Sequence, residues 1–265
     1  MRDADENANA DTIENTEEGG KMSFLDHLDE LRKRLVRIAI YLAAGFFVGF
    51  YFSDELYNFL SGPLIAELDR VDGEMTFTSL TSPFMTSMRV ALMASVFLTL
   101  PFTFFEVWKF ISPGLYRREK KYVIPFVSSS VLLFISGAAF CYMIALPGAF
   151  RFLIDWGMKF EATRPMIRLD EYFSLVTTML IGFGLVFEMP VIIAFLSLFG
   201  LVNARFLLRR FDYALVGIVI LAAVMSPTTD AFNLMLWSAP MIVLYFISIG
   251  IAAIIGWQRR KKGLV

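Results

Sequence analysis

Five acidic side chains stand at positions where a carboxylate can do chemistry, and the deepest of them is Glu188. It lies in the apolar run 184–190, where a charged group at the centre of a bilayer costs about 2.5–3.5 kcal/mol to insert. Such a group is protonated, hydrated or bonded to a partner, and a functional role is the default interpretation of an acid at that depth. The alternative is that Glu188 bonds Ser or Thr hydroxyls of neighbouring helices and only aids packing.

The other four acids are Glu30, Glu106, Glu119 and Asp230. Glu30 stands four residues before Arg34, a spacing that favours a local ion pair on a helix. Glu119 lies among basic residues in the run 117–121, where local charge balance is its simplest role. Glu106 and Asp230 lie near the ends of apolar stretches and are expected to be less buried than Glu188. Asp230 can also cap the helix that follows it.

Enzymatic chemistry finds little support in the sequence. His27 is the single histidine and Cys141 the single cysteine, so a His-rich metal site and a disulfide framework are excluded. There is no phosphate-binding loop and no Gly-rich dinucleotide signature. We therefore expect no enzyme activity and no cofactor. The basic clusters are typical of membrane topology and anionic lipid rather than of nucleic-acid binding.

The elements that must position these residues are membrane-spanning helices. The 265-residue chain is 57% hydrophobic and 18% charged, against about 25% charged in soluble proteins, and its mean hydropathy is +0.62. Six stretches approach the ~20 apolar residues that cross a bilayer. The sequence therefore predicts an all-α polytopic membrane protein with six transmembrane helices. The predicted spans are residues 36–52, 84–105, 123–146, 172–200, 213–225 and 231–256.

Basic residues predict the orientation of these spans. Six spans place both termini on one side, and the segments on that side hold 18 of the 24 Lys and Arg residues. The positive-inside rule then makes both termini cytoplasmic. The last two spans are unusual: residues 213–225 are well short of ~20, and Pro240 is expected to bend or break the sixth. We predict that these two spans are short or broken.

Three kinds of segment flank or connect the spans. Residues 1–21 are strongly acidic and are predicted to be a disordered tail, because so polar a segment cannot bury enough apolar surface to fold. Residues 22–257 are predicted to form one six-span membrane domain and 258–265 a basic cytoplasmic tail. Within that domain, 23–37 are predicted to form an amphipathic helix on the inner membrane face. The outer loops 53–82 and 147–171 are long enough to cap the spans.

Several local motifs then resemble one family. They are HLDELRKR at 27–34, SGPL at 61–64, VWKFISPGLY at 107–116 followed by Glu119, FEMP at 187–190 and SPTTD at 226–230. Each motif is weak alone, but together with six spans they resemble the TatC family of the twin-arginine protein translocase. The resemblance covers roughly residues 22–257.

This resemblance implies a receptor for signal peptides that carry a twin-arginine motif. TatC proteins deliver folded proteins across the bacterial inner membrane with single-span partners, TatA and TatB, using the protonmotive force. The resemblance therefore also implies homo- and hetero-oligomers. It further implies that the short fifth and sixth spans form the edge where TatA and TatB dock.

The resemblance also assigns roles to single residues. Glu30 and Glu119 would face the signal's arginine pair, with Arg32 and Phe110 in the same inner-face patch. Glu188 would be the polar contact for a partner's transmembrane helix. The outer caps would contain Pro63 and Asp230.

The sequence departs from the family pattern at three positions and leaves one functional alternative. Glu106 stands where the family usually has Gln, and Leu234 and Phe246 stand where Gln and Glu are common. The alternative is a proton-coupled small-solute transporter that uses Glu188 as its relay. Such transporters often show inverted repeats, and no convincing repeat is present in this chain.

Overall fold

The computed structural model describes residues 24–111, 123–160, 164–226 and 230–261. The predicted acidic tail, Glu119 and residues 227–229 of the SPTTD motif lie outside them. Five helical spans in the described residues are long and apolar enough to cross a membrane, and a sixth helix is apolar but shorter. The chain is thus an all-α, multi-pass membrane protein, as predicted.

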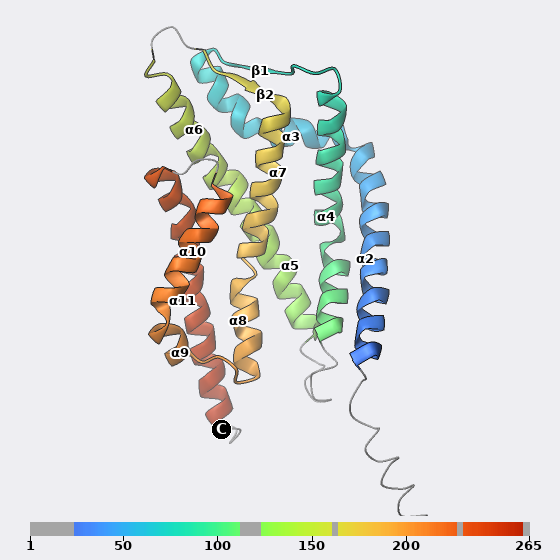
Figure 1. Cartoon of the computed structure of the whole chain (residues 1–265), viewed down its shortest axis with the longest axis vertical. Coiled ribbons are helices and arrows are strands. Elements are labelled where there is room, and N and C mark those ends of the chain that lie inside the picture. Colours follow the sequence, from blue (N-terminus) through green and yellow to red (C-terminus); the bar gives the residue numbers. More distant parts are fainter. Residues whose placement is uncertain (1–23, 112–122, 161–163, 227–229, 262–265) are drawn as a thin grey trace, which may run out of the picture.

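The helices pack side by side with the two described chain ends together (Figure 1). Helix α2 (Phe24–Tyr51) begins, and helix α11 (Ala231–Lys261) ends, at what we call the basic end. The opposite, cap end carries α3 (Ser53–Leu68) and two three-residue strands. Six crossings, an even number, place the start of α2 and the end of α11 on the same side.

Helix α2 differs from expectation at its start. A separate surface helix over 23–37 is wrong, because α2 runs without a break from Phe24 to Tyr51. No Gly or Pro occurs between residues 24 and 44, so nothing interrupts the backbone hydrogen-bond ladder there. The amphipathic segment and the first span therefore share one axis.

A Gly-x-x-x-Gly motif brings α2 against α4 (Ser82–Ile111). A Cβ atom on Gly49 would lie 2.8 Å from the carbonyl oxygen of Ala91, and one on Gly45 would lie 3.0 Å from the Thr99 side chain. Small residues at this spacing let two membrane helices approach closely. The motif is visible in the sequence and correctly marks the contact, although our prediction did not use it.

The middle of the chain contains two interrupted spans. Helix α5 (Val123–Phe140) continues through a π-helical turn (Cys141–Ala145) into α6 (Leu146–Gly157), so this span extends beyond the predicted residue 146. Helix α7 (Leu169–Val186) is followed by α8 (Met189–Leu198), and Glu188 lies at their junction. Pro190 lies in the first turn of α8, where its missing N–H costs no helical bond.

The last two spans differ from one another. After the short α9 (Ala204–Arg209), α10 (Phe211–Met225) has 15 residues, or about 22 Å of helix, and is short as predicted. Helix α11 instead has 31 residues and continues through Pro240, so the last span is neither short nor broken. One proline removes one backbone bond, a loss that membrane helices tolerate when they pack against neighbours, and α11 packs against α8, α10 and α9. Residues 258–261 of the predicted tail are helical.

The predicted caps contain ordered structure. Strand β1 (Glu74–Thr76) pairs in parallel with β2 (Met166–Arg168), and Arg70 Nη2 lies 2.6 Å from Asp155 Oδ1 of α6. Pro63 lies inside α3 and leaves the Phe59 carbonyl without its usual helical donor. The Tyr142 hydroxyl donates to that carbonyl at 2.6 Å. The cap is therefore bonded to the spans below it.

Candidate functional site

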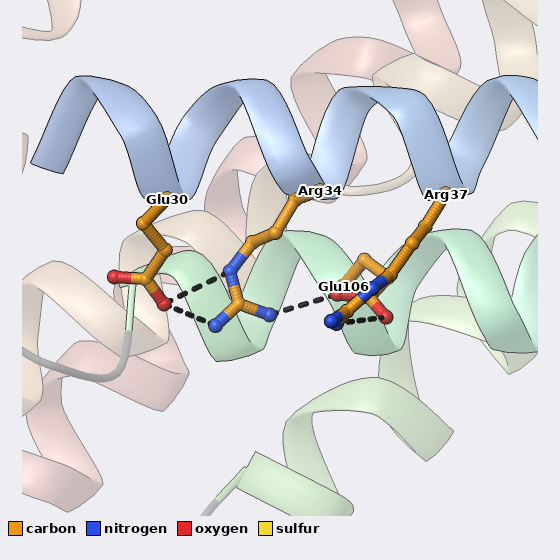
Figure 2. A network of polar contacts seen from close by, with 4 residues as sticks. All are labelled: Glu30, Arg34, Arg37 and Glu106. Atoms are coloured by element: carbon orange, nitrogen blue, oxygen red, sulfur yellow. Dashed lines mark hydrogen bonds and ion pairs between the residues drawn. The ribbon is translucent and has the colours of Figure 1, made fainter.

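Four charged side chains meet between α2 and α4 at the basic end (Figure 2). Arg34 donates through Nη1 to Glu106 Oε2 at 2.8 Å and through Nε to Glu30 Oε1 at 3.1 Å, and its Nη2 also contacts Glu30 Oε1. Arg37 Nη1 lies 3.4 Å from Glu106 Oε1. We call these four residues the ion-pair cluster.

The spacing of the residues on α2 explains the ion-pair cluster. Positions 30, 34 and 37 follow one another at helical intervals and so point from one face of α2 toward α4. Arg34 and Glu106 are 8% and 4% exposed, and buried charges are tolerated only when they are well paired. With two carboxylates and two guanidinium groups, the cluster is formally neutral.

Glu106 is the residue on which the expectation was wrong. It was expected to be less buried than Glu188, yet it is almost fully buried. From its place on α4 it forms ion pairs with both Arg34 and Arg37 of α2. The predicted local pair between Glu30 and Arg34 is confirmed, as is the exposed pair between Asp29 and Lys33 at 2.7 Å. The overlooked signal is the second arginine, Arg37, which has no acidic partner four residues before it.

The sequence-predicted receptor residues are brought together only in part. Phe110 stacks on His27 with ring centroids 4.4 Å apart, one turn before Glu30 on α2, so Glu30 and Phe110 lie in the same α2–α4 interface. Arg32 is exposed, and its position two residues after Glu30 turns it to the other side of α2. Glu119 falls outside the described residues.

One oxygen of Glu30 matters for what the cluster can bind. Its Oε1 is held by Arg34, while its Oε2 is buried and has no hydrogen-bond partner among the described residues. The Glu30 side chain is 21% exposed, against 9% for Arg34. The cluster therefore contains a buried carboxylate oxygen with capacity for a further hydrogen-bond donor.

A second polar network surrounds Glu188. The Trp108 indole N–H donates to the Ser130 hydroxyl at 3.1 Å, and Ser130 in turn forms a side-chain hydrogen bond with Glu188. Glu188 is 6% exposed, and its Oε1 is buried with no partner in the described part of the chain. The contact with a serine hydroxyl of a neighbouring span matches the packing alternative, while the remaining oxygen leaves capacity for another contact.

The two predicted cap residues have structural contacts. Asp230 accepts the backbone N–H of Asn233 at 2.9 Å and its side-chain amide at 2.9 Å, so it caps α11 as the sequence suggested. Pro63 lies in α3, near the Tyr142 bond described above. The Asp230 contacts stabilise the start of α11, and the Tyr142 bond joins α3 to the third span.

The fold and the two networks define a class: a multi-pass helical membrane protein with an ion-pair cluster around the buried Arg34 and Glu106 at its basic end and a buried acid inside its fourth span. Within that class the comparisons are specific. The family model described as "Sec-independent protein translocase protein (TatC)" matches residues 26–240. The chain belongs to the TatC family, as the motifs predicted.

Individual relatives agree with this assignment. The Sec-independent protein translocase protein TatC of Koribacter versatilis is 41% identical over 243 residues, which is 91% of this chain and 89% of the relative. The corresponding protein of Campylobacter jejuni is 38% identical and spans 84% of this chain and 90% of its own. A solved structure named "Crystal Structure of Twin Arginine Translocase Receptor- TatC" superposes with a TM-score of 0.75 at 32% identity, covering 85% and 97% of the two chains.

Proposed function

We propose that this chain is the receptor subunit of a twin-arginine translocase and binds the signal peptides of folded proteins at its basic end. In this proposal the basic end faces the cytoplasm of a bacterial inner membrane, which the positive-inside distribution of Lys and Arg supports. Family membership supports the translocase role in general. The observation that carries the proposed receptor site is the Glu30 carboxylate, whose Oε2 has no partner among the described residues.

A carboxylate in this setting suits an arginine ligand. A guanidinium group donates from a planar fork and can make two parallel bonds to a carboxylate, whereas a lysine ammonium is a point charge. Phe110 and His27 add a stacked aromatic pair one turn away. Replacing the signal's arginines by lysines should therefore weaken binding, even though the charge is unchanged.

Charge recognition alone would be weak. An exposed ion pair contributes about 0–1 kcal/mol and is screened by salt. The apolar stretch of the signal must then supply much of the affinity. We propose that the arginine pair selects the ligand at Glu30 and Glu119, and that apolar contacts retain it.

A peptide titration tests the receptor site. Purified protein in detergent micelles is titrated with a fluorescent twin-arginine signal peptide and with the same peptide carrying two lysines. We expect the lysine peptide and the Glu30→Gln, Glu119→Gln double variant to bind at least tenfold more weakly. The matched control is Asp29→Asn, which removes an exposed acid from the adjacent position of α2. Equal binding of both peptides by the unmodified chain would overturn the proposal.

We also propose that Glu188 is the contact for the transmembrane helix of a TatA- or TatB-type subunit. Its buried Oε1, which has no partner within the described ranges, supports this, because a polar group in a membrane gains from a donor on a neighbouring helix. Glu188→Ala should lower the yield of co-purified TatA and TatB while peptide binding at the basic end stays within twofold. Normal co-purification would contradict the assignment.

The energy source is proposed from the family alone. Export by membrane vesicles that contain this chain, TatA and TatB should stop when an uncoupler removes the protonmotive force, with ATP held constant. Continued export in the presence of the uncoupler would show that another energy source is used.

A further inference from the structure

The receptor carboxylate already holds a guanidinium group of the same chain. Arg34 contacts the single oxygen Oε1 of Glu30 through both Nε and Nη2, the edge of the guanidinium group that a ligand arginine would also present. A ligand that takes both oxygens of Glu30 must therefore compete with Arg34. The rest of the ion-pair cluster determines how costly that competition is.

Arg34 has a second anchor on the other helix. Its Nη1 donates to Glu106 Oε2 at 2.8 Å, and this bond does not involve Glu30. Glu106 Oε1 faces Arg37 at 3.4 Å, so Glu106 is shared between the two arginines. Arg34 can give up its bonds to Glu30 and still keep a buried acid as its partner.

The exposures of the side chains place the three groups in order. The exposed fraction of the side chain is 21% for Glu30, 9% for Arg34 and 5% for Glu106. Of these three groups, Glu30 is therefore the most accessible to a ligand guanidinium, and Arg37, 52% exposed, lies on the other side of Glu106 from Arg34 in the chain of contacts. Displacement would leave Arg34 in place beside Glu106 rather than drive it into the membrane.

From this geometry we infer that Arg34 is an internal competitor for the receptor carboxylate and that Glu106 retains Arg34 when a ligand arginine takes Glu30. This inference rests on the proposed receptor function. It assigns specificity-determining roles to two residues that do not themselves contact the ligand. It also gives the departure at position 106 a purpose, because an uncharged Gln there would leave Arg34 and Arg37 with Glu30 as their only carboxylate in the cluster.

The two residues should act in opposite directions. Arg34→Lys keeps the charge but removes the fork, so it loosens the hold on Glu30 and should raise the affinity for the twin-arginine peptide about three- to tenfold. Glu106→Gln removes the alternative anchor, so Arg34 holds Glu30 more firmly and the affinity should fall about three- to tenfold. A merely structural role would make both variants bind more weakly.

The matched control is Arg37→Lys. Arg37 contacts Glu106 but has no bond to Glu30 in the described cluster, so this variant should change the affinity less than twofold. Adding Glu106→Gln to Arg34→Lys should lower the affinity by less than Glu106→Gln does alone, because Glu106 acts on Glu30 only through Arg34. Thermal unfolding in the same detergent shows which variants remain folded.

The outcomes separate this inference from the proposed function. If the unmodified chain binds the arginine and lysine peptides equally, the proposed function fails. If it discriminates between them but Arg34→Lys binds no better, the competitor role is overturned. If Glu106→Gln binds as well as the unmodified chain, the anchor role is overturned. Arg34→Lys tests the competitor role and Glu106→Gln tests the anchor role. The two tests are independent, so each role is decided by its own folded variant.

Discussion

Glu106 and Glu188 are the same type of side chain at nearly the same burial, but their hydrogen-bonding partners differ in charge and number. Glu106 is 4% exposed and each of its oxygens faces an arginine of α2. Glu188 is 6% exposed, bonds the Ser130 hydroxyl and has a second oxygen without a partner among the described residues. The first carboxylate is compensated by charge and the second only by a neutral group.

The difference shows how position along the membrane determines what a buried acid can do. Near the basic end, α2 supplies guanidinium groups that neutralise Glu106, and the acid then stabilises the contact between two helices. Inside the fourth span, the neighbours that contact Glu188 supply a hydroxyl, so its capacity for hydrogen bonding remains incomplete. We therefore expect Glu106 to matter most for stability and Glu188 most for assembly.

The largest expected effect comes from breaking the charged network. Glu106→Ala leaves Arg34 and Arg37 without their α4 partner and should lower the free energy of unfolding by about 3–5 kcal/mol. Chemical unfolding in mixed detergent micelles measures this. A loss below 1 kcal/mol would show that the ion-pair cluster is not a stabilising element.

A smaller effect is expected from Ser130→Ala. This substitution removes the acceptor of the buried Trp108 indole and the hydroxyl partner of Glu188, and an unsatisfied buried group costs about 1–3 kcal/mol. The same unfolding measurement applies. Ser136, whose hydroxyl bonds only its own helix backbone in the described contacts, provides the control Ser136→Ala.

Glu188→Leu should change stability by no more than about 1 kcal/mol in either direction. The substitution removes a bond to Ser130 but also removes a buried oxygen that lacks a partner in the described part of the chain, and these two effects oppose each other. If Glu188→Leu lowered the free energy of unfolding as much as Glu106→Ala, the proposed difference between the two acids would be wrong.

The smallest effect is expected from Asp29→Ala. Asp29 and Lys33 form an exposed pair with side chains 53% and 68% accessible, and such pairs contribute about 0.3–0.5 kcal/mol. Raising the salt concentration should erase even this difference. A salt-insensitive loss above 1 kcal/mol would indicate a contact beyond the exposed pair.

Much of the fold was predictable because long apolar runs have few alternatives in a bilayer. The six spans, the common side of the termini and the short α10 follow from the lengths of those runs and the distribution of basic residues. Continuity was harder to predict. Pro240 was expected to end or bend a helix that α11 continues, because packing against neighbouring helices outweighs the loss of one backbone bond.

The candidate site was predictable only where its contacts are local. The pair of Glu30 with Arg34 follows from spacing on one helix, whereas the contacts of Arg34 and Arg37 with Glu106 join residues about seventy positions apart. Residue spacing cannot show which face of α4 meets α2. For that reason the sequence marks Glu106 only as a departure from a family pattern, and the structure is needed to show that it is the centre of a cluster.

The Gly45 and Gly49 contact also bears on how the protein is made. Because the two glycines bring α2 against α4 through backbone and small side chains, these helices can associate without any later part of the chain. These two spans precede the other described spans in the chain, and their contact includes the ion-pair cluster. We expect a fragment that ends after α4 to insert into membranes as a stable hairpin, onto which the remaining spans assemble during synthesis.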